Sequence, residues 1–200
     1  SSVSGGVVII GLLLTMITAI ILGMGLPTTA AYVVVAALGA PALTDLGVNL
    51  LAAHLFIFYF AIISAITPPI MLAVFTASSI AESDPWKTGA TAMGIAFAGF
   101  LIPFMFVYGP ELILIGSILN IVLATTTAII GVIALSASTQ AYLVTDTSIP
   151  ERVVLFSAAL GLLLPGLFTD VAALTVFLAT FLRQYVAVNG NLPLSSATSQ

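Results

Sequence analysis

Charged residues are almost absent from this 200-residue chain, and the long runs without them constrain the fold more than any other feature. No charge occurs from Ser1 to Thr44, and only Asp45 appears before Glu82. Charged residues make up 5% of the chain and hydrophobic residues 61%, whereas a soluble domain carries roughly 25% charged residues. A spanning helix needs roughly 20 predominantly apolar residues. The sequence therefore predicts an all-α polytopic membrane protein whose helices are joined by short loops.

The few ionisable residues exclude several classes of function. Three Lys+Arg against seven Asp+Glu cannot neutralise a run of phosphates, so we expect the lipid bilayer and no nucleic acid as a partner. No cysteine and one histidine exclude thiolate chemistry and a histidine-rich metal site. The chain has no Ser-His-Asp set and no Walker A pattern, so we expect neither an enzyme nor a bound cofactor. It also lacks an initiator Met and a signal peptide, and we expect it to be part of a longer membrane protein.

The first apolar segment is interrupted by a cluster of helix-breaking residues. Apolar sequence from Gly5 is broken at Gly23-Met24-Gly25-Leu26-Pro27 and resumes up to Ala40. Glycine is conformationally permissive and proline lacks a backbone donor, so helical hydrogen bonding is expected to lapse here. In hydrocarbon such backbone is tolerated only where protein or a water-filled cavity surrounds it. We predict one discontinuous helix over residues 5–40.

The second apolar segment is interrupted at Thr67-Pro68-Pro69. Leu50–Ile66 precedes the break, and the run Ile70–Ala81 follows at once. Twelve residues in a helix reach about 18 Å, short of the roughly 30 Å hydrocarbon core. We therefore predict a re-entrant helical hairpin over residues 50–81, with one long helix kinked at the two prolines as the alternative.

The rest of the chain predicts further helices. Gly89–Tyr108 is expected to be a full span, mildly broken at Pro103, and Leu112–Ala137 a second span. Two shorter runs, Val153–Leu164 and Val171–Leu182, form either a shallow hairpin or one kinked helix. We accordingly divide the chain into the C-terminal part of a transport region (residues 1–111), additional membrane helices (112–186) and a flexible tail (187–200).

Most polar residues outside the breaks are expected to have local roles. Ser83 or Asp84 should cap the following helix, and Glu111 and Asp170 should cap the apolar runs that they begin. His54 is either a proton relay or, as we prefer, a neutral side chain hydrogen-bonded near the end of its helix. Loop positions are expected for Asp45, Glu82, Asp84, Asp146 and Glu151. Packing or lipid contact is expected for Phe56, Phe58, Tyr59 and Phe60.

The two breaks are the strongest functional candidates. Secondary transporters place substrate and ion sites where broken helices expose carbonyls and half-helix ends, and both breaks carry threonine beside proline. The alternative is that each is only a proline kink satisfied by neighbouring helices.

The motifs of these breaks resemble a known transporter family. Gly23-Met24-Gly25-Leu26-Pro27-Thr28-Thr29-Ala30-Ala31-Tyr32, Ile66-Thr67-Pro68-Pro69 and Ala73-Val74-Phe75-Thr76-Ala77 are similar to the C-terminal half of the large permease subunit of TRAP (tripartite ATP-independent periplasmic) transporters. The Gly-Met-Gly-Leu-Pro-Thr-Thr form is closest to the TAXI type, in which small and large membrane subunits are often fused. The resemblance runs from about Ser4 to Glu111.

The resemblance implies a Na⁺-driven, elevator-type importer in the bacterial inner membrane. Such a permease takes a small organic anion from a periplasmic substrate-binding protein and works with a small membrane subunit, or with its fused equivalent upstream. The chain would then be half of an inverted-repeat transporter, with Na⁺ as coupling ion. The competing interpretations are a non-transporting structural or assembly membrane protein and a channel, although no charged ring supports a channel.

Site residues follow from the breaks and the resemblance together. Carbonyl oxygens and hydroxyls are expected to hold Na⁺, and exposed N–H groups beside the breaks to hold the substrate carboxylate. The Na⁺ candidates are Gly23, Gly25, Thr28, Ser64 and Thr67. The substrate-binding candidates are Thr29, Thr67, Pro68, Pro69 and Ile70.

Overall fold

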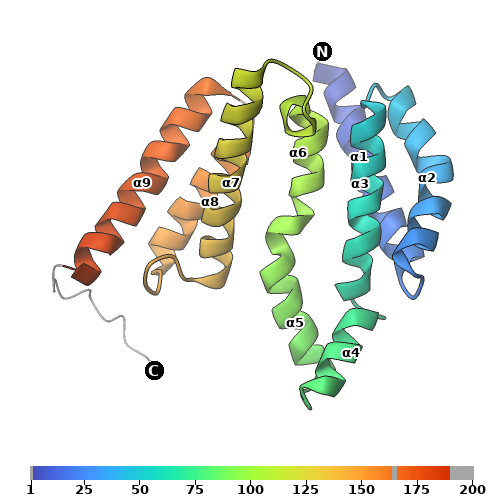
Figure 1. Cartoon of the computed structure of the whole chain (residues 1–200), viewed down its shortest axis with the longest axis horizontal. Coiled ribbons are helices and arrows are strands. Elements are labelled where there is room, and N and C mark those ends of the chain that lie inside the picture. The colour runs from blue at the N-terminus through green and yellow to red at the C-terminus, as the bar shows by residue number, and fades with distance from the viewer. Residues whose placement is uncertain (1, 164–165, 190–200) are drawn as a thin grey trace. The chain divides into compact units, whose positions relative to one another are not determined.

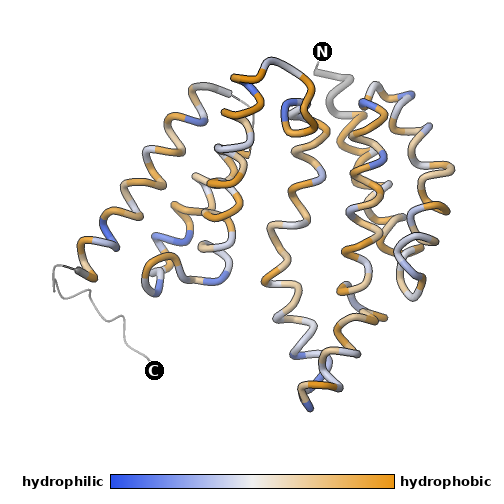
Figure 2. Tube along the Cα trace, in the orientation of Figure 1, coloured by the Kyte–Doolittle hydropathy of each residue, from blue (hydrophilic) through white to orange (hydrophobic). Residues whose placement is uncertain are grey.

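The computed structural model describes residues 2–163 and 166–189, which are almost entirely helical (Figure 1). Apart from one isolated bridge between Tyr142 and Asp146, the described residues contain no β-structure. Four described helical segments are long and apolar enough to cross a membrane: Thr28–Asp45, Pro85–Tyr108, Ile118–Gln140 and Phe168–Val188. Hydrophilic residues gather mostly at helix ends and connecting loops (Figure 2). The predicted all-α polytopic fold is confirmed.

The chain divides into two compact units, Ser1–Ile115 and Gly116–Gln200. The division falls near the boundary predicted between residues 111 and 112. Each unit has its own packed helices, and the two are described separately.

The first unit begins with two helices that form an antiparallel hairpin, α1 (Ser2–Gly23) and α2 (Thr28–Asp45). A Cβ added to Gly11 would lie 2.5 Å from Leu46 Cδ1, and one added to Gly39 would lie 3.5 Å from Thr15 Cγ2. Early residues of α1 therefore face late residues of α2, so the chain reverses at the break. The prediction of one discontinuous helix over residues 5–40 is wrong, because the helices pack along their lengths where glycine permits close approach.

The second break joins helices that do not fold back on each other. It lies between α3 (Leu50–Ile63), which continues into the 3₁₀ turn η1 (Ser64–Ile66), and α4 (Leu72–Ile80). Figure 1 shows α4 continuing beyond the end of α3 and lying beside α5 (Pro85–Ile95). The predicted re-entrant hairpin over residues 50–81 is wrong, and the alternative of a long interrupted helix describes the chain.

Packing against α5 explains why the chain continues in this direction. Met71 is fully buried, and a Cβ added to Gly89 would lie 2.7 Å from Met71 Sδ and 3.7 Å from Val74 Cγ1. Burying apolar surface against α5 takes the place of the contact with α3 that a hairpin would have made. The fold thus contains both predicted features, a hairpin and a discontinuous helix, in exchanged positions.

The core of the first unit is built around α3. Phe56 and Phe60 are fully buried and pack edge-on against each other, and both contact Phe104. Phe104 belongs to α6 (Ile102–Tyr108), which α5 reaches through the 3₁₀ turn η2 (Ala96–Phe100). The predicted span 89–108 is thus helical over Pro85–Tyr108, but its interruption lies at η2. Pro103 occupies the first turn of α6, where its missing N–H costs nothing.

The start of α5 is capped as expected. Asp84 is the N-cap residue, and its Oδ1 accepts a hydrogen bond of 2.8 Å from the Lys87 backbone N–H. Pro85 occupies the first turn. Glu111, by contrast, lies inside the first turn of η3 (Pro110–Ile113), where Gly109 holds the cap position, so its predicted capping role is wrong.

The second unit consists of α7 (Ile118–Gln140), α8 (Ile149–Leu163) and α9 (Leu167–Asn189). Ser138 Oγ donates to Arg152 O at 2.8 Å, and a Cβ added to Gly131 would lie 3.1 Å from Leu162 Cβ, so α7 and α8 are antiparallel. A Cβ added to Gly161 would lie 2.9 Å from Ala173 Cβ, so α8 and α9 form a hairpin. The last two apolar runs are therefore two separate helices.

Helix α9 extends well beyond the predicted run Val171–Leu182. Arg183 forms an ion pair of 3.4 Å with Glu151, and the fully buried Gln184 accepts hydrogen bonds from the backbone N–H groups of Val144 and Thr145. These partners allow polar residues inside the helix. Because the helix begins at Leu167, Asp170 lies inside its first turn and not at a cap. The predicted tail falls largely on residues 190–200, outside the described residues.

Glu151 is held by several groups at this end of the second unit. Burial alone would raise its pKa, but the N–H and O–H of Ser148, both 2.9 Å from Oε2, and the charge of Arg183 lower it below the usual value of 4.5. The carboxylate is therefore stabilised in its charged form.

Candidate functional site

The tip of the α1–α2 hairpin leaves backbone groups without partners. Gly25 has a φ of +81°, and Met24 N–H to Ile20 O and Leu26 N–H to Gly23 O are the backbone hydrogen bonds that close the turn. Within the described residues, the carbonyls of Met24, Gly25 and Leu26 accept no hydrogen bond. Helix α2 has Pro27 at its N-cap with no side-chain cap, so its first N–H groups also have no partner in the described chain.

The break between α3 and α4 also leaves backbone groups without hydrogen-bond partners among the described residues. Ser64 Oγ donates to Ala61 O at 2.7 Å, and Thr67 Oγ1 donates to Ile63 O at 2.9 Å. Each hydroxyl proton is thus used and each oxygen keeps lone pairs to accept or to ligate. The Pro68–Pro69 bond is cis, and Met71 has a φ of 33°. Among the described residues no hydrogen bond reaches the carbonyls of Pro68, Pro69 or Ile70.

The two breaks contact each other. Gly23 is buried against Ser64, and a Cβ added to Gly23 would lie 2.5 Å from Ser64 Oγ and 2.9 Å from Ser64 Cβ. A Cβ added to Gly25 would lie 3.6 Å from Ile70 Cδ1. Because Gly23 has no side chain, the first break can pack directly against Ser64, about 40 residues later in the sequence.

The remaining predicted site residues belong to the same two breaks. Thr28 is half-buried and Thr29 exposed in the first turn of α2, while Thr67 is half-buried and Pro68 and Pro69 are exposed. In the described part of the chain, no hydrogen bond joins the threonines of one break to the other break.

No charged residue occurs in Gly23–Thr29 or in Ser64–Met71. The described residues also contain no group of three or more His, Asp or Glu side chains that could hold a metal ion. Carbonyl and hydroxyl oxygens, which carry partial negative charge, are therefore the groups here that could hold a cation. The free N–H groups at the starts of α2 and α4 carry partial positive charge and could receive an anion.

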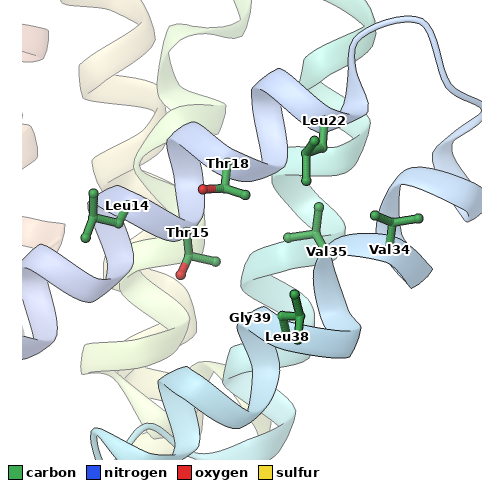
Figure 3. Close-up of a pocket in the computed structure, with 8 residues that line it drawn as sticks. All are labelled: Leu14, Thr15, Thr18, Leu22, Val34, Val35, Leu38 and Gly39. Carbon is green, nitrogen blue, oxygen red and sulfur yellow. The ribbon is translucent and has the colours of Figure 1, made fainter.

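A separate pocket of about 230 Å³ lies between α1 and α2 (Figure 3). It is lined by Leu14, Thr15, Thr18, Leu22, Val34, Val35, Leu38 and Gly39. None of the predicted site residues lines it. Sequence reasoning did not single out Thr15 and Thr18, although two threonines three residues apart in an apolar helix share one face.

His54 is hydrogen-bonded within the protein. Tyr32 Oη lies 2.9 Å from His54 Nδ1, and this hydrogen bond links α2 to α3. The rings of Tyr32 and Phe58 pack edge to face. Both partners of the hydrogen bond are half-buried. The structure thus gives His54 the hydrogen-bonded role preferred from the sequence.

Comparison with known protein families gives a match. The model of the family described as "Tripartite ATP-independent periplasmic transporter, DctM component" matches residues 1–121, which include both helix breaks and the whole first unit. No curated protein and no solved structure matches the chain. The match covers 121 of 200 residues and agrees with the polytopic helical fold. The chain therefore belongs to the DctM component family of tripartite ATP-independent periplasmic transporters, whose members are membrane permeases.

Proposed function

We propose that this permease couples the entry of Na⁺ to the import of a small organic anion, and that the two helix breaks form the shared site. The observation that carries the proposal is the contact of Gly23 with Ser64 and of Gly25 with Ile70. This contact joins two uncharged segments that both expose backbone carbonyls and helix N-termini.

The cation would be held by oxygens of both breaks. Small hard cations favour oxygen ligands, and carbonyls can replace their hydration water. The backbone oxygens at Gly23 and Gly25 and the hydroxyls of Thr28, Ser64 and Thr67 supply such ligands. Because these ligands come from two separate segments, bound Na⁺ would hold the hairpin tip against the second break.

The anion would be held on the other side of the same contact. Thr29 and Thr67 offer hydroxyls, and Pro68, Pro69 and Ile70 lead into the free N–H groups at the start of α4. A carboxylate is favoured at such helix starts. No fixed cation is then required, which agrees with the uncharged sequence of both breaks.

The family match supports a set of partners for this activity. A periplasmic substrate-binding protein would deliver the anion, and a small membrane subunit or a fused equivalent upstream would complete the permease in the bacterial inner membrane. The Gly-Met-Gly-Leu-Pro-Thr-Thr form of the first break favours the TAXI type within this family.

The test is Na⁺-dependent uptake by the complete permease in proteoliposomes, with its binding protein and an imposed Na⁺ gradient. Gly25→Val should reduce uptake strongly, because a β-branched residue is disfavoured at positive φ and the tip would distort. Gly47→Val is the matched control, since Gly47 has a φ of +89° with no atom within 4 Å of an added Cβ and lies away from both breaks.

A second pair of variants tests the hydroxyl. Thr67→Ala should raise the Na⁺ concentration needed for half-maximal uptake with little loss of folded protein, and Thr67→Ser should restore it. Thr76→Ala is the control, because Thr76 makes the same kind of bond, 3.0 Å to Leu72 O, outside the break. Undiminished Na⁺-dependent uptake in both Gly25→Val and Thr67→Ala would refute the proposal and favour a structural or assembly role.

A further inference from the structure

The second unit contains a pocket of about 330 Å³ that has no part in the site described above. It lies between the last turn of α7 and the first two turns of α8, and is lined by Ser138, Thr139, Ile149, Arg152, Val153 and Phe156. The four residues from α8 are spaced i, i+3, i+4 and i+7, so they share one face of the helix. One cationic side chain is thus set within an apolar stripe.

The guanidinium of Arg152 is fixed in position but only partly used. Its Nε donates to Ser138 O at 2.9 Å and its Nη2 to Thr139 O at 3.5 Å, at the C-terminal end of α7. A guanidinium has five N–H groups, so these two bonds leave three without a protein partner among the described residues. The orientation is set by the helix end, and the remaining donors are available to a ligand.

Arg152 also has no ion-pair partner in the described part of the chain. The ion pair found among residues 2–163 and 166–189 joins Arg183 to Glu151, at 3.4 Å, and not Arg152. Glu151 is further occupied by two hydrogen bonds from Ser148. A half-buried cation without a carboxylate partner attracts an anion, and it binds phosphate oxygens well because its planar donors match them.

The position of the pocket favours a lipid as the source of that phosphate. Ser138 and Thr139 are in the last turn of the candidate membrane span Ile118–Gln140, so Arg152 lies where the apolar span ends. On the same face, Ile149 lies about one turn before Arg152, whereas Val153, Phe156 and Leu160 follow it back along the span. Ile149 and Val153 are 77% and 61% exposed, and Phe156 and Leu160 are also exposed. At the end of a span, exposed apolar side chains can pack against the acyl chain of a lipid while a neighbouring cation binds its headgroup.

We propose that this pocket binds an anionic phospholipid, with its phosphate on Arg152 and an acyl chain along the face of α8 from Val153 to Leu160. The lipid would stabilise the α7–α8 pair, because its phosphate would complete the hydrogen bonding of the residue that caps α7. The proposal does not depend on the transport site of the first unit.

The test uses the complete permease and phosphatidylglycerol that carries a photoreactive group in its acyl chain, with labelled peptides mapped by mass spectrometry. Label is expected on the α8 peptide. Arg152→Gln should reduce that label about fivefold, as expected when about 1 kcal/mol of attraction per cation is lost. Since Arg152 also caps α7, a second variant is Ile149→Glu, which keeps Arg152 and places a competing carboxylate beside it at an exposed position.

Matched controls distinguish specific binding at Arg152 from a general attraction of anionic lipid to positive charge. Lys87→Gln removes the same charge from an exposed position outside this unit, leaves the Arg183–Glu151 ion pair intact and should leave labelling of α8 unchanged. Labelling elsewhere in the chain should not respond to any variant. The proposal is overturned if phosphatidylcholine labels α8 equally, or if both Arg152→Gln and Ile149→Glu label normally. It is also overturned if an excess of inorganic phosphate removes the label, since the site would then belong to a soluble anion.

Discussion

Replacing Gly23 by alanine probes the contact on which the candidate transport site rests. A Cβ at this position would lie 2.5 Å from Ser64 Oγ and 2.9 Å from Ser64 Cβ, closer than real Cβ atoms approach. Ser64 is buried and its hydroxyl is tied to Ala61 O at 2.7 Å. The serine cannot turn away without losing that bond, so the hairpin tip must move instead.

The expected size of the effect follows from two opposing terms. Inserting a methyl group into a packed contact costs about 1–3 kcal/mol. Alanine gains about 1 kcal/mol over glycine in a helix interior, and at the last residue of α1 it regains only about half of that. The free energy of unfolding of the complete permease should therefore fall by about 0.5–2.5 kcal/mol, and Na⁺-dependent uptake should fall with it because the two breaks are pushed apart.

A double-mutant cycle isolates the contact. Gly23→Ala combined with Ser64→Gly exchanges the positions of the two small groups, and should recover about 1–2 kcal/mol relative to the sum of the single variants. Reversible unfolding in mixed micelles measures the free energies. Gly39→Ala is the control within the same hairpin, because its Cβ would make one tight contact, 3.2 Å to the far end of a side chain at Ile57 Cδ1, and ordinary contacts of 3.5 Å to Thr15 Cγ2 and 3.7 Å to Val35 Cγ1.

Two results would refute this reasoning. One is a Gly23→Ala permease as stable as the original. The other is strict additivity of the two substitutions, which would mean that Gly23 and Ser64 do not touch in the folded protein.

Three further perturbations test other parts of the structure. Asp84→Ala should lower the free energy of unfolding by about 1 kcal/mol through loss of the α5 cap, whereas Asp84→Asn should not; equal effects in thermal unfolding would exclude capping. Tyr32→Phe should cost about 0.5–1.5 kcal/mol by removing the hydrogen bond to His54, and an unchanged unfolding temperature would show that the bond contributes nothing. Because the folded-state pKa of Glu151 is lowered, its stabilisation is present above the usual value of 4.5 and is lost as the pH falls through the lowered value. Stability measured against pH should lose that acidic step in Glu151→Gln, and a step that persists would have to come from another group.

The sequence was sufficient to locate both breaks, because glycine and proline interrupt helices through local backbone chemistry. It was not sufficient to predict what the chain does after each break. The reversal at Gly23 depends on the fit of Gly11 against Leu46 and of Gly39 against Thr15, and the continuation past Thr67 depends on Met71 packing against α5. Such contacts join residues far apart in the sequence, so local patterns predicted the hairpin and the discontinuous helix in exchanged places.

The length of α9 was missed for a related reason. Arg183 and Gln184 look like the end of an apolar run when taken alone. Their partners, Glu151 and the loop N–H groups at Val144 and Thr145, lie more than 30 residues earlier. The cap at Asp84 was predictable because its partner is only three residues away.

The buried Gln184 imposes an order on the assembly of the second unit during synthesis. Its Oε1 satisfies the N–H groups of Val144 and Thr145, which leave the ribosome about 40 residues earlier. At about 5–20 residues per second, the loop after α7 waits about 2–8 s for this partner. Over that interval the two N–H groups lack Gln184 as an acceptor and must donate their hydrogen bonds to water. The loop must therefore stay at the membrane surface until α9 is made, because unpaired backbone groups are not tolerated in hydrocarbon. A chain that stops before Gln184 should therefore show fast amide exchange at Val144 and Thr145.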